Sequence, residues 1–369
     1  MCNTFYVRLI FALVLSTSAL AETANPFQSE TIASLDQPWA MTFMPDGRLL
    51  VTQKSGRLVI VTQDGHVSPP IKGVPNVDYR GQGGLGDVVL HPDFQHNNLV
   101  YISYAEAGFG NTRGAAVARG TLGFDEGGRA TLSNVNVIWR QLPKVSGAGH
   151  YGHRIAFDNE GFLFISSGDR QKFDPAQDLQ SAIGKIVRLN DDGSIPESNP
   201  FFERGDVTAQ IWSLGHRNPL GLAIDAQGRL WSSEMGPRHG DELNLVTRGA
   251  NYGYPIVSNG DHYSGFKIPD HDTRPEFEAP KAWWTPSIAP AGLIFYTGDL
   301  FLDWHNSALI PGLKSQAIIR VTIDGDKAAE IERFDMGARI REIEQGPDGA
   351  LWVLEDGDGA RLLKLTPKA

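Results

Sequence analysis

The sequence contains almost no cysteine, and the one cysteine in its 369 residues is Cys2. Cys2 lies inside an apparent export signal, so the mature chain would have no disulfide and no cysteine metal site. Long apolar runs are also missing after that segment, because no stretch approaches the ~20 residues of a membrane helix. We therefore expect a mature chain without a membrane span that depends on its hydrophobic core for stability.

Residues 1–21 have the three parts of a secretory signal peptide. Arg8 supplies the basic region, Leu9–Leu20 is the apolar region, and Ala19-Leu20-Ala21 is a cleavage site of the A-x-A type. The alternative, a buried N-terminal helix, does not explain the cleavage site. We expect residues 22–369 to form a single exported, periplasmic domain.

Sequence motifs of several common enzyme classes are absent. No G-x-G-x-x-G follows a first strand, no P-loop occurs, and no G-x-S-x-G is present. Nicotinamide, nucleotide triphosphate and serine-hydrolase chemistry therefore lose their usual support. The formal net charge of −10 makes nucleic acid and anionic membranes poor partners.

A pattern of two strands joined by a glycine-containing turn occurs six times. Each copy has a strand of small and apolar residues, a turn such as Pro-Asp-Gly, and a second alternating strand. The turns are roughly 45 to 70 residues apart, which leaves room for four strands in each unit. The copies are Leu35–Val61, Gly83–Ala105, His153–Asp169, Asn218–Gly236, Pro290–Leu313 and Ile340–Pro367.

The six copies predict an all-β fold, a six-bladed β-propeller whose two ends meet in one blade. A β-sandwich or a pair of barrels is the alternative, but it does not require such a regular hairpin repeat. Long connections on a rigid scaffold often carry function. Three such connections are Asn111–Ser146, Gln171–Asp206 and Pro237–Pro286.

Polar residues directly before two of the copies are candidates for chemistry. His150 precedes the third copy, and Arg217 and Asn218 precede the fourth. Equivalent positions in two blades would face the same central channel. The ordinary pKa of histidine, ~6.5, suits a general base, and arginine offers a planar fork of donors for carboxylates. The alternatives are a histidine that caps a turn and an arginine in a surface salt bridge.

Two further groups suggest ligands for an anion and for a cation. Lys314, Arg339 and Arg341 stand near blade starts of an acidic chain and predict a pocket for a multiply charged anion, unless carboxylates of neighbouring blades neutralise them. Gly236-Pro237 would leave adjacent carbonyls free, close to Glu242. Carbonyls and carboxylates are the oxygen ligands that calcium takes, although a solvated acidic turn is the alternative.

The motifs together resemble those of the soluble pyrroloquinoline quinone (PQQ)-dependent sugar dehydrogenases, most closely the aldose sugar dehydrogenase branch. The resemblance spans nearly the whole mature chain, and its most specific part is GHRNP-x-GL followed by E-x-GP. It rests on LDQPWAMTFMPDGRLL, GQGGLGDVVLHPDF, HYGHRIAFD, GHRNPLGLA, EMGPRHGDELN, NYGYP, PSIAPAGLIFY and RIREIEQGPDG. It implies a six-bladed propeller that oxidises sugars to lactones with PQQ and calcium over the central channel.

The resemblance also implies roles for individual residues. His150 would be the base that takes the proton of the anomeric hydroxyl, with Arg217 beside the reacting carbonyl. Contacts to the quinone are implied for Gln82, Arg217, Asn218, Tyr263, Lys314, Arg339 and Arg341. Calcium ligands are implied at the carbonyls of Gly236 and Pro237, and a further calcium at Glu242 and Tyr252.

One residue departs from the pattern of the glucose-specific members of this family. They carry an aspartate directly before the base histidine, whereas this chain has Gly149. The missing carboxylate suggests an enzyme that accepts several aldoses. We further expect an unidentified exported protein or molecule to accept the electrons, and the protein to act as a monomer or homodimer. A calcium-dependent propeller lactonase and a non-catalytic binding propeller are the alternatives, but neither explains the cationic residues.

Overall fold

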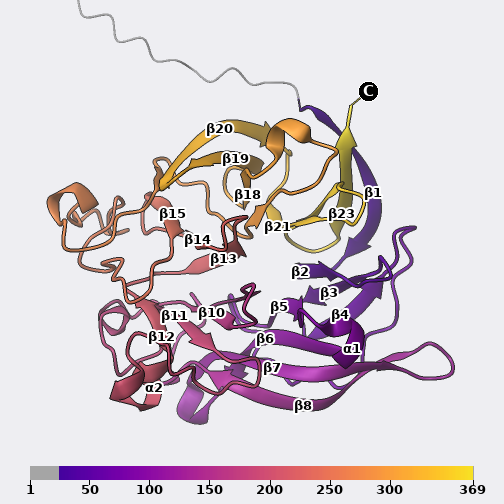
Figure 1. Ribbon diagram of the computed structural model, residues 1–369, viewed down its shortest axis with the longest axis horizontal. Coiled ribbons are helices and arrows are strands. Elements are labelled where there is room, and N and C mark those ends of the chain that lie inside the picture. Colours follow the sequence, from indigo (N-terminus) through magenta and orange to yellow (C-terminus); the bar gives the residue numbers. More distant parts are fainter. Residues whose placement is uncertain (1–24, 369) are drawn as a thin grey trace, which may run out of the picture.

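Six β-sheets form the blades of a propeller in the computed structural model, which describes residues 25–368 (Figure 1). The predicted six-bladed, all-β fold is confirmed. The predicted signal peptide, residues 1–21, lies outside the described residues. In residues 25–368, no helix has the length and apolar character needed to cross a membrane.

The blades follow one another along the chain as antiparallel sheets, and the first strand of each lies nearest the axis. Blade 1 has three strands, β2 (Pro38–Phe43), β3 (Leu49–Gln53) and β4 (Arg57–Val61). Blade 2 is β5 (Leu85–Leu90), β6 (Leu99–Ala107), β7 (Arg113–Phe124) and β8 (Ala130–Arg140). Blade 3 is β9 (Gly152–Phe157), β10 (Leu163–Ser167), β11 (Lys185–Leu189) and β12 (Ile211–Leu214).

The second half of the ring has the same organisation. Blade 4 is β13 (Pro219–Ile224), β14 (Leu230–Glu234), β15 (Asp241–Leu245) and β16 (Ala282–Trp284). Blade 5 is β17 (Ile294–Phe295), β18 (Ala308–Gly312), β19 (Ala317–Asp324) and β20 (Lys327–Asp335). Blade 6 is β21 (Ile340–Gln345), β22 (Leu351–Glu355), β23 (Ala360–Pro367) and β1 (Phe27–Leu35).

Helices in the described residues are short and lie in connections. The two α-helices are α1 (Phe94–Asn97) and α2 (Asp206–Gln210). The 3₁₀ helices are η1 (Phe109–Asn111), η2 (Asp174–Ala176), η3 (Phe202–Arg204), η4 (His271–Thr273) and η5 (Leu302–Trp304).

The repeated sequence pattern corresponds to the two inner strands of each blade. The turns that join them need a residue with positive φ, which Gly47 (φ 83°) supplies in blade 1 and Gly228 (φ 77°) in blade 4. Asp225 Oδ1 accepts hydrogen bonds from the N–H groups of Gln227 and Arg229, at 3.0 and 2.9 Å, and so fixes the second of these turns.

The ring closes because the first described strand completes the last blade. β1 pairs antiparallel with β23, from Phe27 opposite Pro367 to Leu35 opposite Ala360 (Figure 1). The Phe27 ring also packs edge-on against Trp304 and Phe334 of blade 5. The predicted meeting of the two ends in one blade is confirmed.

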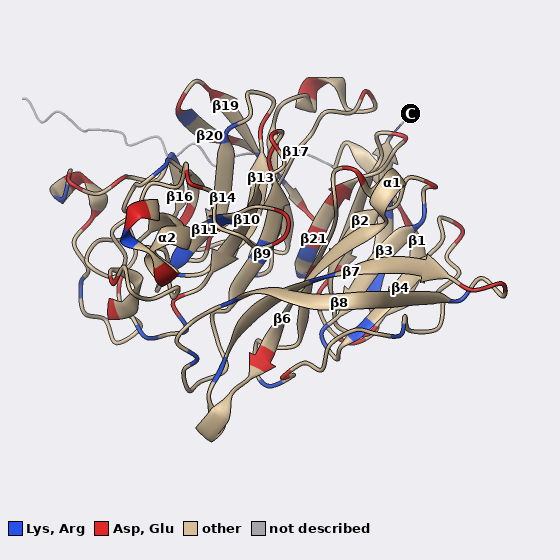
Figure 2. Cartoon of the chain, turned by 60° about the horizontal axis from the view of Figure 1, so that its bottom comes forward, with Lys and Arg blue, Asp and Glu red and all other residues tan. Residues whose placement is uncertain are grey.

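The hydrophobic core of the described chain is divided among the interfaces between blades. Six buried clusters occur, and each lies mainly between two neighbouring blades; the cluster of blades 1 and 2 also includes Leu220 of blade 4. Trp231 fills the interface of blades 4 and 5, and Trp352 that of blades 6 and 1. Figure 2 shows that most strand segments carry no charge and that both signs are spread over the connections.

One of the three predicted long connections consists mostly of β-strands. Residues 111–146 contain β7 and β8, which are the outer strands of blade 2. Residues 171–206 contain β11, and residues 237–286 contain β15 and β16, but both also contain irregular segments that reach the site described next.

Candidate functional site

Three adjoining cavities open at the end of the ring where the inner strands begin. The central cavity, about 500 Å³, is lined by Trp39, His153, Asn218, Arg341 and others. The side cavity, about 590 Å³, shares Gln82, Met235 and Ala289 with it. The rim pocket, about 280 Å³, shares His150, Arg217, Pro237 and Tyr263 with the side cavity.

The topology explains why residues far apart in the sequence line these cavities. In each blade the inner strand leaves this end of the ring and the second strand returns to it. The lining residues just before inner strands include Gln37, Gln82, His150, Asn218, Ala289 and Arg339. Those just after second strands include Lys54, Asp169, Met235, Lys314 and Asp356.

His150 lines both the side cavity and the rim pocket, and carboxyl and amide groups fix it. Its Nδ1 lies 2.6 Å from Oδ1 of Asp169, and its backbone N–H donates to Oε1 of Gln82 at 2.7 Å. Because an ionised carboxylate can only accept, Nδ1 carries the proton and Nε2 of the neutral ring is the basic nitrogen. The other oxygen of Asp169 is buried and has no hydrogen-bond partner among residues 25–368.

The surroundings of His150 keep its imidazole neutral over a wider pH range than usual. Burial lowers the pKa of His150, and the nearby Arg217 lowers it as well. The hydrogen bond to Asp169 acts in the opposite direction and raises this pKa, but the net shift is downward. A neutral histidine with a directed Nε2 is suited to accept a proton.

A neighbouring side chain occupies the space that a side chain at residue 149 would need. A Cβ atom on Gly149 would lie 2.8 Å from Cδ and Oε1 of Gln171, so the Gln171 amide fills the space. Gln171 itself lines the rim pocket. The Gln171 amide therefore lies where a side chain of residue 149 would stand, and Asp169 supplies the carboxylate that orients His150.

Arg217 and Asn218 line neighbouring cavities of the site, and a buried carboxylate holds the backbone of Arg217. Glu234 Oε1 accepts the backbone N–H of Arg217 at 2.5 Å, and Glu234 Oε2 lies 2.9 Å from Nδ1 of the fully buried His216. Arg217 Nη1 donates to the carbonyl of Met235 at 2.9 Å, and Asn218 Oδ1 accepts the N–H of Gly152 at 3.2 Å. These contacts fix both side chains at the cavity wall.

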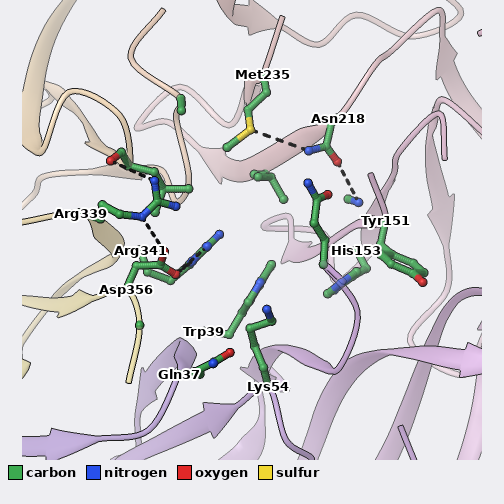
Figure 3. A pocket seen from close by; sticks show the side chains of 16 residues that line it. Gln37, Trp39, Lys54, Tyr151, His153, Asn218, Met235, Arg339, Arg341 and Asp356 are labelled. Carbon is green, nitrogen blue, oxygen red and sulfur yellow. Dashed lines mark hydrogen bonds and ion pairs between the residues drawn. The ribbon is translucent and has the colours of Figure 1, made fainter. Parts of the chain in front are cut away.

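A cationic group forms another wall of the central cavity (Figure 3). Arg339 Nε and Arg341 Nε donate to the two oxygens of Asp356, at 2.8 and 2.9 Å. Lys54 joins them, and burial together with the charge of Arg341 lowers its pKa. Lys314, in the side cavity, donates to Ser287 Oγ at 3.0 Å. In the central cavity, one carboxylate therefore stands against the three cations Lys54, Arg339 and Arg341.

Three buried polar atoms on residues that line the cavities have no hydrogen-bond partner in the described residues. They are the hydroxyl of Tyr151, in the central cavity, Nε of Arg217, in the side cavity, and Oδ2 of Asp169, in the rim pocket. These atoms are themselves closed off from the cavities, so they do not indicate a ligand. The cationic wall of the central cavity does, and it fits an anionic ligand that carries several oxygens.

The carbonyls of Gly236 and Pro237 are at the side cavity and are free. Neither oxygen accepts a hydrogen bond from another described residue, and Pro237 also reaches the rim pocket. Asp241, in the same cavity, accepts the N–H of Gly236 at 2.9 Å and that of Ala289 at 2.7 Å. Burial raises the pKa of Asp241 to about 6. These oxygens suit a hard cation.

Glu242 and Tyr252 do not line the three cavities. Both are buried in blade 4 and its following connection, where Tyr252 stacks on His216 at 4.6 Å. Beside Glu242, Asn244 donates to its Oε2 at 3.1 Å, while Oδ1 of Asn244 is buried without a partner. Within residues 25–368, no three His, Asp or Glu side chains gather as a metal site.

Tyr263 stands at the mouth of the site, from the long connection after β15. It is 74% exposed, lines both the side cavity and the rim pocket, and lies 5.9 Å from Arg217 Cζ by its ring centroid. The rim pocket also has an aromatic wall, because the Phe173 ring lies 6.3 Å from that of Tyr254.

The buried Lys185 fixes the segment that follows Gln171 and Phe173. Lys185 Nζ donates to the carbonyls of Pro175, Ala176 and Ile183 at 2.8, 2.9 and 2.7 Å. Gln171 and Phe173 themselves have strained backbone, with φ 59° at Gln171 and 63° at Phe173. Strain of this kind persists where the surroundings over-determine the conformation, as at binding sites.

Ten of the twelve predicted site residues therefore line the cavities. Besides His153, the site contains five further residues that the sequence analysis did not assign to it. The missed residues are Lys54, Tyr151, Asp169, Gln171 and Asp356. Lys54, Asp169 and Asp356 follow the second strand of their hairpins, so attention to that position in each copy would have identified them.

A ring of six blades with an oriented histidine beside a cationic cavity is typical of a β-propeller enzyme whose site suits an anionic ligand. The sequence profile of the Glucose / Sorbosone dehydrogenase family matches residues 35–364. The chain is 40% identical to the aldose sugar dehydrogenase YliI of Escherichia coli strain K12 over 366 residues, which is 98% of each chain.

Solved structures agree with this match. The apo form of the soluble aldose sugar dehydrogenase of Escherichia coli has a TM-score of 0.87 and 40% identity, over 93% of this chain and 100% of that one. The PQQ-bound aldose sugar dehydrogenase of Streptomyces coelicolor has a TM-score of 0.77 and 28% identity, over 94% of this chain and 100% of that one. The chain belongs to the Glucose / Sorbosone dehydrogenase family and is an oxidoreductase.

Proposed function

We propose that this protein is a PQQ-dependent aldose sugar dehydrogenase that oxidises the anomeric carbon of several aldoses to lactones. The observation that carries the proposal is that the side cavity, which the oriented His150 lines, adjoins a central cavity walled by Lys54, Arg339 and Arg341. A ligand with several carboxylates needs such fixed cations, whereas a neutral sugar alone does not.

The residues present fit the quinone and a calcium ion. Lys314, Arg339 and Arg341 would hold the carboxylates, Gln82, Arg217 and Asn218 would contact the ring system, and Tyr263 would cover it. The carbonyls of Gly236 and Pro237 would bind the calcium. When bound, the quinone supplies the hydride acceptor and calcium the Lewis acid that polarises it. Glu242 and Tyr252 would serve a further calcium, beside the unpartnered Asn244 Oδ1.

His150 moves the proton in this reaction. Asp169 holds Nδ1–H, so Nε2 accepts the proton of the anomeric hydroxyl as the hydride leaves the same carbon. Asp169 then stabilises the imidazolium that forms. Gln171 replaces a carboxylate beside the base with a neutral amide, which supports a broad choice of aldoses.

We also propose that residues 1–21 direct export to the periplasm and that residues 22–369 act there as one domain. The reduced cofactor would pass its electrons to an exported acceptor. We expect the protein to act as a monomer or as a homodimer.

Dye reduction by the purified apoprotein tests the proposal. With PQQ and calcium, a panel of aldoses is expected to support turnover, and a calcium chelator is expected to lower it. His150→Ala should reduce kcat by about 10²–10⁴ while the PQQ affinity stays within a few-fold. The exposed His305→Ala is the control. Failure of every aldose, together with absence of PQQ binding, would contradict the function; unchanged turnover in H150A would contradict the base.

A further inference from the structure

His153 is a second histidine at the site, and neither the mechanism nor the family resemblance uses it. It is the second residue of β9, is 2% exposed, and lines the central cavity opposite Arg339 and Arg341 (Figure 3). Its φ of 57° is unusual for a residue other than glycine. A strained residue in a cavity wall suggests a role for its side chain.

Space for the ring is made by the neighbouring blade. A Cβ atom on Gly86 of β5 would lie 1.9 Å from Cε1 of His153, so only glycine at residue 86 admits the imidazole. On its face, the ring stacks on Trp39 with centroids 4.9 Å apart and planes 22° apart. The imidazole therefore has one orientation.

The hydrogen bonds of Ser103 determine which ring nitrogen carries the proton. Ser103 Oγ accepts the backbone N–H of Asp87 at 2.7 Å and lies 2.8 Å from Nδ1 of His153. The fully buried hydroxyl has no other acceptor among the described residues, so its proton goes to Nδ1. Burial also lowers the pKa of His153 to about 3, which keeps the ring neutral. The proton of the imidazole is therefore on Nε2.

The Nε2–H group is a donor without a partner. It makes no hydrogen bond with any described residue. The Nε2 atom keeps some accessible surface, and His153 lines the central cavity. The cationic neighbours Arg154 and Arg341 favour an acceptor oxygen nearby rather than a second donor. A fixed neutral donor beside two arginines suits an anionic oxygen.

We infer that His153 is a cofactor-binding residue whose Nε2–H donates to an oxygen of the quinone tricarboxylate in the central cavity. The inference rests on the proposed function, since that function supplies the ligand. His153 would add a neutral hydrogen bond to the attraction of the cations. This hydrogen bond would fix the position of the ligand beside Trp39.

A matched pair of variants tests the donor. His153→Gln keeps an N–H at the end of the side chain, whereas His153→Met has the same length without a donor, and both meet the same backbone strain. Apoprotein with calcium is titrated with PQQ and followed by tryptophan fluorescence. H153M should bind PQQ roughly tenfold more weakly or worse, and H153Q should stay within a few-fold of the natural protein.

Nuclear magnetic resonance of ¹⁵N-histidine in the apoprotein tests the tautomer without relying on the variants' folding. The signal that H153Q lacks should show the Nε2–H form, and its proton should shift when PQQ is added. An Nδ1–H form, or equal PQQ affinity of the two variants, overturns the inference alone. Absence of PQQ binding by the natural protein overturns the proposed function, and this inference with it.

Discussion

At the scale of single residues, the contact between His150 and Asp169 determines the chemistry of the site. Asp169 follows β10 and is fully buried, with Oδ1 bound to the imidazole and to the N–H of Gln171 at 2.9 Å. It raises the pKa of His150 against the larger effect of burial. Removing its charge should therefore change both the proton affinity of the base and the rate.

Asp169→Asn should move the acid limb of the kcat/KM profile to lower pH. The reason is that His150 must be neutral to act, and loss of the carboxylate lowers its pKa further. The plateau should fall by roughly 10- to 100-fold, because the imidazolium that forms loses its partner. Profiles measured from pH 4 to 9 check this, with Asp174→Asn on the same segment as control. A limb that moves upward would show that Asp169 does not raise the pKa.

At the scale of elements, the inner hairpins were predictable and the outer strands less so. The Asp-Gly turns between inner strands need a particular backbone conformation, so they are visible in the sequence. β8 buries only two of its eleven residues and alternates weakly, and the segment Asn111–Ser146 therefore resembled an insertion. Site residues that directly precede a repeat were predictable, because the repeats are visible in the sequence. Asp169 and Asp356 follow second strands, and they reach the site only because each second strand returns to the cavity end of the ring.

The closing strand β1 contributes more than its backbone pairing. Phe27 is buried at its start and packs against Trp304 and Phe334, with centroids 6.3 and 5.6 Å apart. Phe27→Ala should lower the free energy of unfolding by about 3 kcal/mol, since a large buried side chain is lost. Urea unfolding followed by fluorescence measures the change. The exposed neighbour in Gln28→Ala should leave stability nearly unchanged, and an equal loss in both variants would refute a packing role.

At the scale of the whole molecule, the channel beneath the cavities concentrates buried charge. Arg154 of β9 bonds to Asp87 of β5 at 3.1 Å and to Glu342 of β21, and its guanidinium lies 4.2 Å from the Trp39 ring centroid. Four inner strands are thus tied together, because Arg154 Nε also donates to the carbonyl of Leu220 in β13. No sequence pattern places these groups together, since their approach depends on ring closure.

This cluster should make stability depend on pH. Burial raises the pKa of Glu342 to about 7, above the value near 4.5 of the unfolded chain. The folded state then binds more protons between those values, so this group's contribution to stability falls as pH rises through that window. Glu342→Gln should remove on the order of 2 kcal/mol of that fall.

Urea unfolding at pH 5, 6, 7 and 8 measures the effect of Glu342→Gln. The variant's free energy of unfolding should vary less across this range than that of the natural protein. Glu126→Gln, in an exposed turn, is the control and should follow the natural curve. Parallel curves for E342Q and the natural protein would mean that Glu342 does not titrate in this range.

The pairing of β1 with β23 has a consequence for synthesis. Blade 6 is composed of the first strand to be made and the last three, so its sheet stays incomplete until translation ends. Until then β1 lacks its partner strand β23, and Arg339 and Arg341, at the start of blade 6, are not yet in place at the central cavity. Contacts between such distant parts of a chain form slowly. The central cavity is therefore completed late in biogenesis.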